Sequence, residues 1–178
     1  MPDGPEIVRT HGPMVWKTVW RLVGTGGRDC DAADCFQEVF IAALEVAKKE
    51  PVRNWEAMLR HIATSKGLDM LRARIRGRKR EAAGVDWESL GSEADPPDAG
   101  LLREEQAVAL KEALSRLRAE EAELFCLRHL EEMSYEEIGM HLRMTPGAIG
   151  VALHRTKEKL RGLMNAGRVS SRREVSDE

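Results

Sequence analysis

Two helix signals separated by a very short turn, between residues 130 and 164, constrain the fold more than any other part of the sequence. Ser134 followed three residues later by Glu137 forms a capping box at the start of the first helix. The turn is Arg143-Met144, and Thr145-Pro146 then supplies a capping hydroxyl and a proline at the first helical position. The pattern predicts a helix-turn-helix, the element that places its second helix in the major groove of DNA.

The second helix of this pair is expected to have one apolar face. That face comprises Ile149, Leu153, Thr156, Leu160 and Leu163. Four bases lie mostly on its other faces, namely Arg155, Lys157, Lys159 and Arg161. A helical hairpin from an unrelated bundle is the alternative interpretation of this segment.

The composition favours an all-α protein, because only 4% of the residues are aromatic, 33% are charged, and Leu, Ala, Glu and Arg are frequent. No apolar stretch approaches the length needed to span a bilayer, so no membrane insertion is expected. The first residues do not resemble a signal peptide, which predicts a cytoplasmic protein.

Cysteines and histidines give no sign of a metal site or of catalysis. Three cysteines are too few and odd in number for a disulfide framework, and none has zinc-ligand spacing with a histidine. No nucleophile motif and no glycine-rich phosphate loop is present. We therefore predict no catalytic residues, no metal and no cofactor.

The net charge is only −2, but the acidic and basic residues are unevenly distributed along the chain. Residues 1–80 carry 15 bases and 10 acids, whereas residues 81–100 carry six acids and no base. Residues 101–138 sum to −5, and residues 139–164 sum to +4. Two separate basic regions of this kind can each attract nucleic acid although the whole chain is nearly neutral.

Helical periodicity and its interruptions predict the domain organisation. Apolar stripes with helical spacing indicate a first helical domain over residues 7–80, although the phase slips near residues 65–67. Residues 81–100, with Pro96-Pro97 and three glycines, predict a flexible acidic linker. A second helical domain is expected over residues 101–164, and residues 165–178 are expected to form a disordered tail.

Asp31, Asp34, Gln37 and Glu38 share one face of a predicted helix, opposite the apolar residues. Carboxylates and an amide in such a stripe suit metal binding, acid–base chemistry or the docking of a basic partner. Ligands on adjacent turns of one helix do not converge on a metal without a second element. A solvated helix face with acids near its N-terminus is the non-functional alternative.

Residues 72–80 contain six bases in nine positions, at the end of a helix that also carries apolar residues. Such a density favours contact with phosphates, because each neutralised phosphate releases counterions. A cationic helix C-terminus that only complements the helix dipole is the alternative interpretation.

The order of these motifs resembles the sigma-70 family of bacterial RNA polymerase, specifically its extracytoplasmic-function (ECF) sigma factors. The run Asp31-x-x-Asp34-x-x-Gln37-Glu38-Val39-Phe40 is similar to the region 2 helix that grips the polymerase clamp. Ile62-Ala63 and Leu68-Asp69-x-Leu71-Arg72 resemble the region 2 segment that reads and melts the minus-ten element. The helix-turn-helix resembles region 4, which reads the minus-thirty-five element.

The resemblance implies a fold of two small helical domains, a region 2 bundle and a region 4 helix-turn-helix. It implies that Asp31, Asp34, Gln37 and Glu38 bind RNA polymerase, and that the loop of residues 48–55 holds a flipped base. The DNA-binding residues that it implies are Arg53, Asn54, Trp55, Ser65, Lys66, Arg72, Arg74, Arg76, Arg78, Lys79, Arg80, Thr145, Ala148, Val151, Ala152, Arg155 and Lys157.

The expected function is that of an ECF sigma factor, which binds core RNA polymerase and directs promoter recognition, melting and initiation without being an enzyme. Core polymerase and promoter DNA are the expected partners, with an anti-sigma factor as a further candidate. A stand-alone dimeric helix-turn-helix regulator is the rival. Gly150 and Ala152 stand where the family commonly has Lys and Arg, so a sigma-like protein that no longer reads DNA is a third possibility.

Overall fold

The computed structural model describes residues 4–24, 29–82 and 99–174, and every regular element within these ranges is a helix. The all-α prediction is therefore confirmed. The elements are α1 (Gly4–Val19), the π-helical turn η1 (Trp20–Gly24), α2 (Asp29–Lys49), α3 (Trp55–Ala82), α4 (Ala99–Arg116), α5 (Ala119–His129), α6 (Tyr135–Leu142) and α7 (Pro146–Glu174). Among these helices, none combines the length and the apolar character that crossing a membrane requires.

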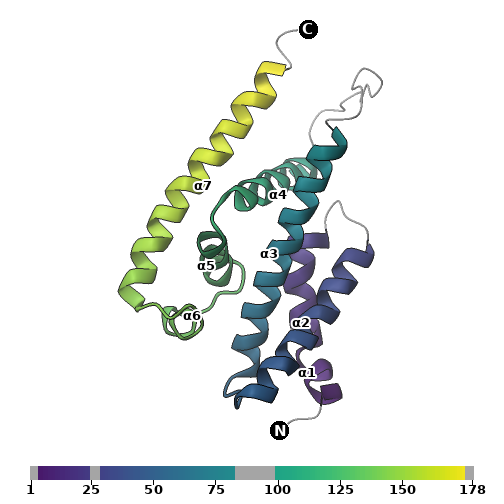
Figure 1. Ribbon diagram of the computed structural model, residues 1–178. Coiled ribbons are helices and arrows are strands. Elements are labelled where there is room, and N and C mark those ends of the chain that lie inside the picture. Colours follow the sequence, from purple (N-terminus) through teal and green to yellow (C-terminus); the bar gives the residue numbers. More distant parts are fainter. Residues whose placement is uncertain (1–3, 25–28, 83–98, 175–178) are drawn as a thin grey trace.

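Helices α1, α2 and α3 form the N-terminal bundle (Figure 1). The predicted stripe of α1 and η1 is buried through Val15, Val19 and Leu22, while Trp16 and Trp20 stay 40% and 39% exposed. Helix α2 buries Val39 and Ala43 on the opposite side of the helix from its acidic stripe. The apolar periodicity of the sequence therefore predicts the faces that form this core.

Helix α3 runs without interruption through the place where the sequence predicts a slip of phase. Gly67 accounts for the interrupted apolar pattern, because a Cβ atom at this position would lie 2.8 Å from Leu22 Cδ1 of η1. The missing side chain admits Leu22 against the helix backbone. Helix α3 thus keeps its geometry while its apolar pattern is interrupted.

The C-terminal half contains the predicted helix-turn-helix as α6 and α7. Glu137 N donates to Ser134 Oγ at 3.2 Å and Ser134 N donates to Glu137 Oε2 at 2.8 Å, so both bonds of the capping box are present. Arg143 ends α6 with a left-handed φ of 54°. A Cβ atom at Gly139 would lie only 2.6 Å from the Met144 carbonyl oxygen, which makes the turn dependent on glycine at this position.

The ends of the helices refine the predicted boundaries. Helix α3 continues to Ala82 and α4 begins at Ala99, so most of the predicted linker, residues 83–98, lies outside the described residues. The prediction of a disordered tail from residue 165 is wrong as far as Glu174, because α7 continues to that residue. No proline interrupts this stretch, and each further residue of an existing helix adds one hydrogen bond.

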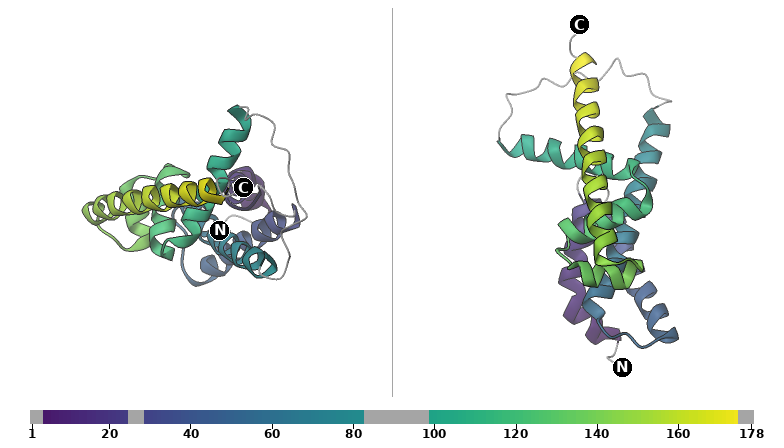
Figure 2. Two further views of the ribbon diagram at one scale, coloured as in Figure 1. Left: turned by 90° about the horizontal axis from the view of Figure 1, so that it is seen from above. Right: turned by 90° about the vertical axis from the view of Figure 1, so that its left-hand side faces the viewer.

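The two halves pack directly on each other, with α3 lying against α4, α5 and α6 (Figures 1 and 2). Ala57 of α3 is 3% exposed and belongs to an apolar cluster formed otherwise by residues of the C-terminal half, including Leu127 and Ile138. A second cluster joins residues of both halves. Two helical domains therefore share their apolar interior in this arrangement.

Candidate nucleic-acid interface

The predicted recognition face of the helix-turn-helix is open to solvent. Thr145 Oγ1 accepts a hydrogen bond from Ala148 N at 3.3 Å and caps α7. Val151 is 54% exposed, and Arg155 is also exposed. The exposed side chains predicted for this face are Thr145, Ala148, Val151, Arg155 and Lys157, whereas Ala152 is half-buried against the apolar cluster. The face is mostly short and apolar, with bases toward one end.

The basic run at the end of α3 separates into two sets. Arg74 is half-buried and donates to the Val23 carbonyl oxygen at 2.7 Å, which ties α3 to η1. The Arg72 side chain is only 14% exposed and lies 3.4 Å from Asp69 Oδ1. Arg76, Arg78 and Arg80 are exposed, and the side chain of Lys79 is outside the described part. The exposed set lies where a nucleic-acid backbone can reach it.

The loop between α2 and α3 borders an open pocket of about 440 Å³. Lys48, Lys49 and Trp55 are among the residues that line it. Exposed Asn54 accepts a hydrogen bond from Ala57 N through Oδ1 at 3.0 Å and so caps α3, while Arg53 is exposed beside it. The family resemblance implies a base-binding role for this loop, and the pocket beside it is lined by an aromatic ring and two ammonium groups.

The acidic stripe of α2 is exposed at Asp34, Gln37 and Glu38, whereas Asp31 is half-buried. Lys66 Nζ lies 3.2 Å from Glu38 Oε2, so a side chain predicted to bind DNA pairs with the stripe instead, and the neighbouring Ser65 is half-buried. Sequence reasoning missed Ile41, which is 61% exposed on the same face. Its position four residues after Gln37 was the available signal.

The cysteines that the structure describes are core residues, as the sequence predicted. Burial is the main cause that raises the pKa of Cys35 to about 11 and that of Cys126 to about 12. Both thiols therefore stay protonated at neutral pH, which disfavours metal binding and nucleophilic chemistry. Within the described ranges, no group of three or more His, Cys, Asp or Glu residues is placed to hold a metal ion.

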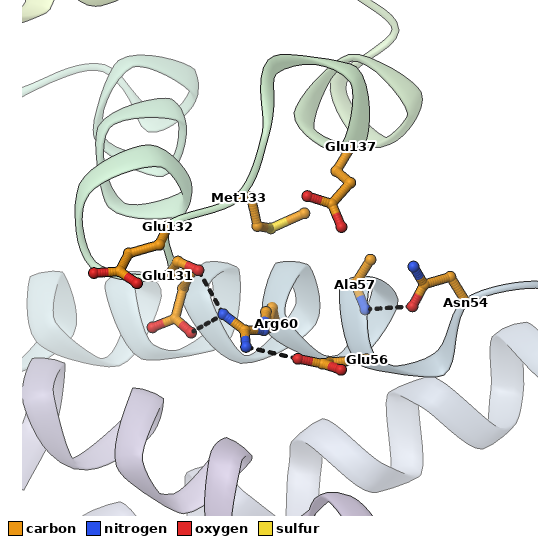
Figure 3. A pocket seen from close by; sticks show the side chains of 8 residues that line it. All are labelled: Asn54, Glu56, Ala57, Arg60, Glu131, Glu132, Met133 and Glu137. Carbon is orange, nitrogen blue, oxygen red and sulfur yellow. Dashed lines mark hydrogen bonds and ion pairs between the residues drawn. The ribbon is translucent and has the colours of Figure 1, made fainter.

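A second pocket, of about 290 Å³, lies where the two halves meet (Figure 3). Asn54, Glu56, Ala57 and Arg60 line it from the N-terminal half. Glu131, Glu132, Met133 and Glu137 line it from the C-terminal half. The predicted base-binding segment therefore ends beside residues of the helix-turn-helix domain, a proximity that no local sequence pattern indicated.

Two family models match the chain, one for each half. The model described as "Sigma-70 region 2" matches residues 7–77, and that described as "Sigma-70, region 4" matches residues 107–160. These spans agree with the bundle of α1 to α3 and with the helix-turn-helix half.

Relatives with established names span both halves. The chain is 32% identical to the ECF RNA polymerase sigma factor SigE of Mycolicibacterium smegmatis, over 90% of this chain and 61% of that protein. It is 36% identical to the ECF sigma factor ShbA of Streptomyces griseus, over 73% and 70% of the two chains. The chain thus spans about three fifths of the length of SigE and more of ShbA.

A solved structure has a similar fold. The sigma factor RpoE, in complex with the anti-sigma factor NepR from Bartonella quintana, matches with a TM-score of 0.50 and 21% identity, covering 89% of this chain and 94% of that one. The order of a region 2 bundle and a region 4 helix-turn-helix defines the class as sigma-70 proteins. Within this class, the chain belongs to the ECF sigma factor family.

Proposed function

We propose that the chain binds core RNA polymerase and directs it to a promoter. The observation that carries this proposal is that one chain exposes both the acidic stripe of α2 and the recognition face of α7. The stripe offers carboxylates and an amide to a polymerase surface, and the recognition face offers a helix to the major groove. The polymerase supplies the chemistry, so this chain contributes binding energy only.

Region 2 would hold the opened minus-ten element. Trp55 in the pocket beside the α2–α3 loop can stack on an unpaired base, and Lys48 and Lys49 can neutralise nearby phosphates. Flipping a base costs a few kcal/mol of unstacking, which contacts made only with the open strand must offset. Arg76 and Arg80, further along α3, would neutralise additional phosphates of the same DNA strand.

Region 4 would bind upstream duplex DNA through α7. Arg155 is exposed on α7 and can reach a base edge or a phosphate, whereas in the first turn of the helix Ala148 N is already bonded to Thr145 Oγ1 and Pro146 has no N–H. Short apolar side chains at Ala148 and Val151 suit thymine methyl groups. Weak binding by region 4 alone is expected from such a surface.

The docking surface is tested by reversing its charge. Asp34→Lys combined with Gln37→Ala should weaken binding to purified core polymerase, while the circular dichroism spectrum and Tm stay close to those of the parent, since both side chains are exposed. Glu112→Lys on α4 is a matched control, because it makes the same charge change at an exposed acid of the other domain. Equal core affinity for the double variant and the parent would remove the docking assignment.

A stand-alone dimeric regulator remains the rival function. It accounts for the helix-turn-helix but leaves the exposed stripe of α2 without a partner. Light scattering of the free chain, together with transcription by core polymerase with and without the chain, separates the two. A dimer that binds duplex DNA and never restores initiation by core polymerase would favour the regulator.

An anti-sigma factor is a further proposed partner, supported by the fold shared with a sigma factor solved in complex with one. Function with polymerase and DNA would take place in the cytoplasm. Co-purification of the chain from cells with a second small protein, and loss of initiation when that protein is added back, would support this partner.

A further inference from the structure

A buried carboxylate bonds the recognition helix α7 to α5. Glu121 of α5 is 9% exposed, and its Oε1 atom accepts hydrogen bonds from two cationic side chains. One donor is Arg118 Nη2 at the start of α5, 2.8 Å away, and the other is Lys159 Nζ of α7. A single carboxylate therefore joins the N-terminus of α5 to the middle of α7.

The Glu121 carboxylate keeps its charge at neutral pH. Hydrogen bonds from Arg118 and Lys159 lower its pKa to about 2, although burial acts in the opposite direction. Loss of the Lys159 ammonium group would leave Arg118 on the carboxylate, so the buried charge would still be compensated. The bond between α5 and α7 can therefore be removed from the α7 side without leaving a buried charge unpaired.

Lys159 lies at the edge of the recognition face. It follows exposed Arg155 by four residues, and the next residue, Leu160, is 4% exposed and belongs to the core. Its position along the helix suits a phosphate contact as well as a contact with α5. The structure pairs its ammonium group with Glu121, and the Lys159 side chain stays 51% exposed.

A second contact supports the first half of α7. The guanidinium carbon of Arg128 of α5 lies 5.3 Å from the centre of the Tyr135 ring, and Arg128 Nη1 donates to the Met133 carbonyl oxygen at 2.9 Å. Tyr135 in turn lies against α7, because a Cβ atom at Gly150 would be 3.7 Å from Tyr135 Cε2. Helix α5 thus supports α7 near Gly150 through α6, and directly at Lys159 (Figure 1).

Two separate contacts along one helix define its direction, whereas a single contact leaves it free to tilt. Gly150 and Lys159 are about 14 Å apart along α7 at 1.5 Å per residue. Hydrogen bonds to base edges weaken steeply when distance and angle change. Attraction between a base and a phosphate changes more slowly with distance. A tilt of α7 should therefore reduce sequence selectivity more than it reduces general attraction to DNA.

We propose that Glu121 and Lys159 are positioning residues that set the direction in which α7 enters the major groove, and that Lys159 does not neutralise a DNA phosphate. This inference deepens the proposed function of region 4 and rests on it. Selectivity for upstream duplex DNA depends on the pair, whereas the charge that α7 offers to phosphates comes from Arg155 and Lys157.

Four substitutions separate positioning from phosphate contact. Lys159→Met is the primary variant, because it removes the ammonium group and keeps most of the aliphatic chain. Lys159→Arg keeps a cationic donor for Glu121 and should behave as the parent does. Glu121→Gln removes the charge from the α5 side, and Glu120→Gln is its matched control at the adjacent exposed acid. As a fifth, contrasting variant, Lys157→Met removes a proposed phosphate contact.

The chain assembled with core polymerase is tested on two duplexes, the upstream sequence that the parent complex selects from a random library and a scrambled sequence of the same composition. All affinities are measured well below the Tm of every variant, so lost stability does not contribute. Lys159→Met and Glu121→Gln should lower the ratio of the two affinities by about three- to tenfold and leave the salt slope unchanged. Glu120→Gln should match the parent. Lys157→Met should weaken both duplexes equally and reduce the salt slope by about 0.9.

Two results for Lys159→Met would overturn the proposal. Equal weakening on both duplexes with a reduced salt slope would make Lys159 a phosphate contact, and an unchanged ratio would remove its positioning role. If Glu121→Gln does not fold, Lys159→Met and Lys159→Arg still give the answer, because Arg118 keeps Glu121 paired in both. A parent complex that selects no upstream sequence would refute the proposed function itself, whereas a selective parent with an unaffected Lys159→Met variant refutes this inference alone.

Discussion

His141 of α6 stacks on His61 of α3 with ring centroids 5.0 Å apart, so two titratable rings lie between the halves. His61 Nε2 is also 3.1 Å from Glu123 Oε1 of α5. Burial lowers the pKa of His141, and the neighbouring His61 lowers it further against the opposing effects of Glu137 and Glu123. The folded chain therefore disfavours protonation of this ring.

The folded chain should lose stability as the pH falls below about 6.5, the ordinary pKa of an unfolded histidine. Below that value the unfolded chain binds a proton that folded His141 does not, so the free energy of unfolding decreases until the lowered pKa is reached. His141→Phe keeps the stacking without the titration and should lose less Tm between pH 7.5 and 5.5. For a chain of this size, about 1 kcal/mol corresponds to roughly 2–4 °C. Identical pH dependence in the two proteins would contradict this assignment.

The arginines of residues 72–80 should differ in whether they contribute to folding stability or to DNA binding. Arg74→Ala removes the bond to the Val23 carbonyl and should lower stability by about 1–2 kcal/mol in a denaturant titration. Arg76→Ala with Arg80→Ala should change stability by no more than about 0.5 kcal/mol per site, since both are exposed. The same pair should reduce the salt slope of single-strand binding by about 1.4 if each contacts one phosphate. A stable Arg74→Ala variant would count against the structural role.

The sequence predicts the role of a residue when its hydrogen-bond partner lies only a few positions away in the chain. The capping box of Ser134 and the N-cap at Thr145 depend on residues three positions away, so their pattern is visible in the sequence and the structure confirms it. Arg74 and Lys66 find partners 51 and 28 positions away. A base in a basic run looks the same in the sequence whether it faces DNA or a backbone carbonyl.

At the scale of elements, α3 is unusual because it packs on two sides. Gly67 receives Leu22 from η1, whereas Ala57 and His61 contact the C-terminal half. A helix buried on two sides loses the single apolar stripe on which periodicity depends. The slip of phase at residues 65–67 includes Gly67, which receives Leu22 of η1, and an isolated stretch of sequence cannot identify that partner.

Helix α7 should gain affinity for upstream DNA from one added base on its exposed face. Val151→Arg should steepen the salt slope of duplex binding by about 0.9 if it contacts one phosphate, with little change in Tm because the site is 54% exposed. Met140→Arg, at a site 68% exposed on α6, makes the same change away from this face and serves as the control. Equal gains from both variants would indicate non-specific attraction and would remove Val151 from the interface.

At the scale of the whole molecule, the sequence predicts a cleavable connection and the structure predicts that the cleaved fragments stay associated. The prolines and glycines of residues 81–100 favour proteolysis there first. Because the halves share apolar clusters and Glu131 contacts Thr18, Arg21 and Arg60 of the other half, the two fragments should elute together in gel filtration at low salt and separate in mild denaturant. Fragments that separate at once in buffer would show that the packing of the two halves on each other is weak in solution.

The class of fold and the two domains could be predicted because each domain is specified by periodicity and caps within a short stretch of chain. The packing of one domain on the other could not be predicted in the same way. Glu131 lies 113 positions from Thr18 and 71 from Arg60, and nothing in the adjacent sequence marks it as different from exposed Glu132. The folded chain distinguishes the two acids, because Glu131 is 5% exposed while Glu132 is exposed and has a left-handed φ of 55°.

The length of α7 makes its far end sensitive to small rotations of region 4 relative to region 2. Its 29 residues span about 44 Å at 1.5 Å per residue, and its last turns extend past α4 in both side views (Figures 1 and 2). A rotation of region 4 by about ten degrees around the α5–α6 turn therefore displaces the far end of α7 by roughly 8 Å, because the helix acts as a lever of known length. A probe attached near exposed Asn165 converts a small angular motion at the domain contact into a displacement that distance measurements resolve.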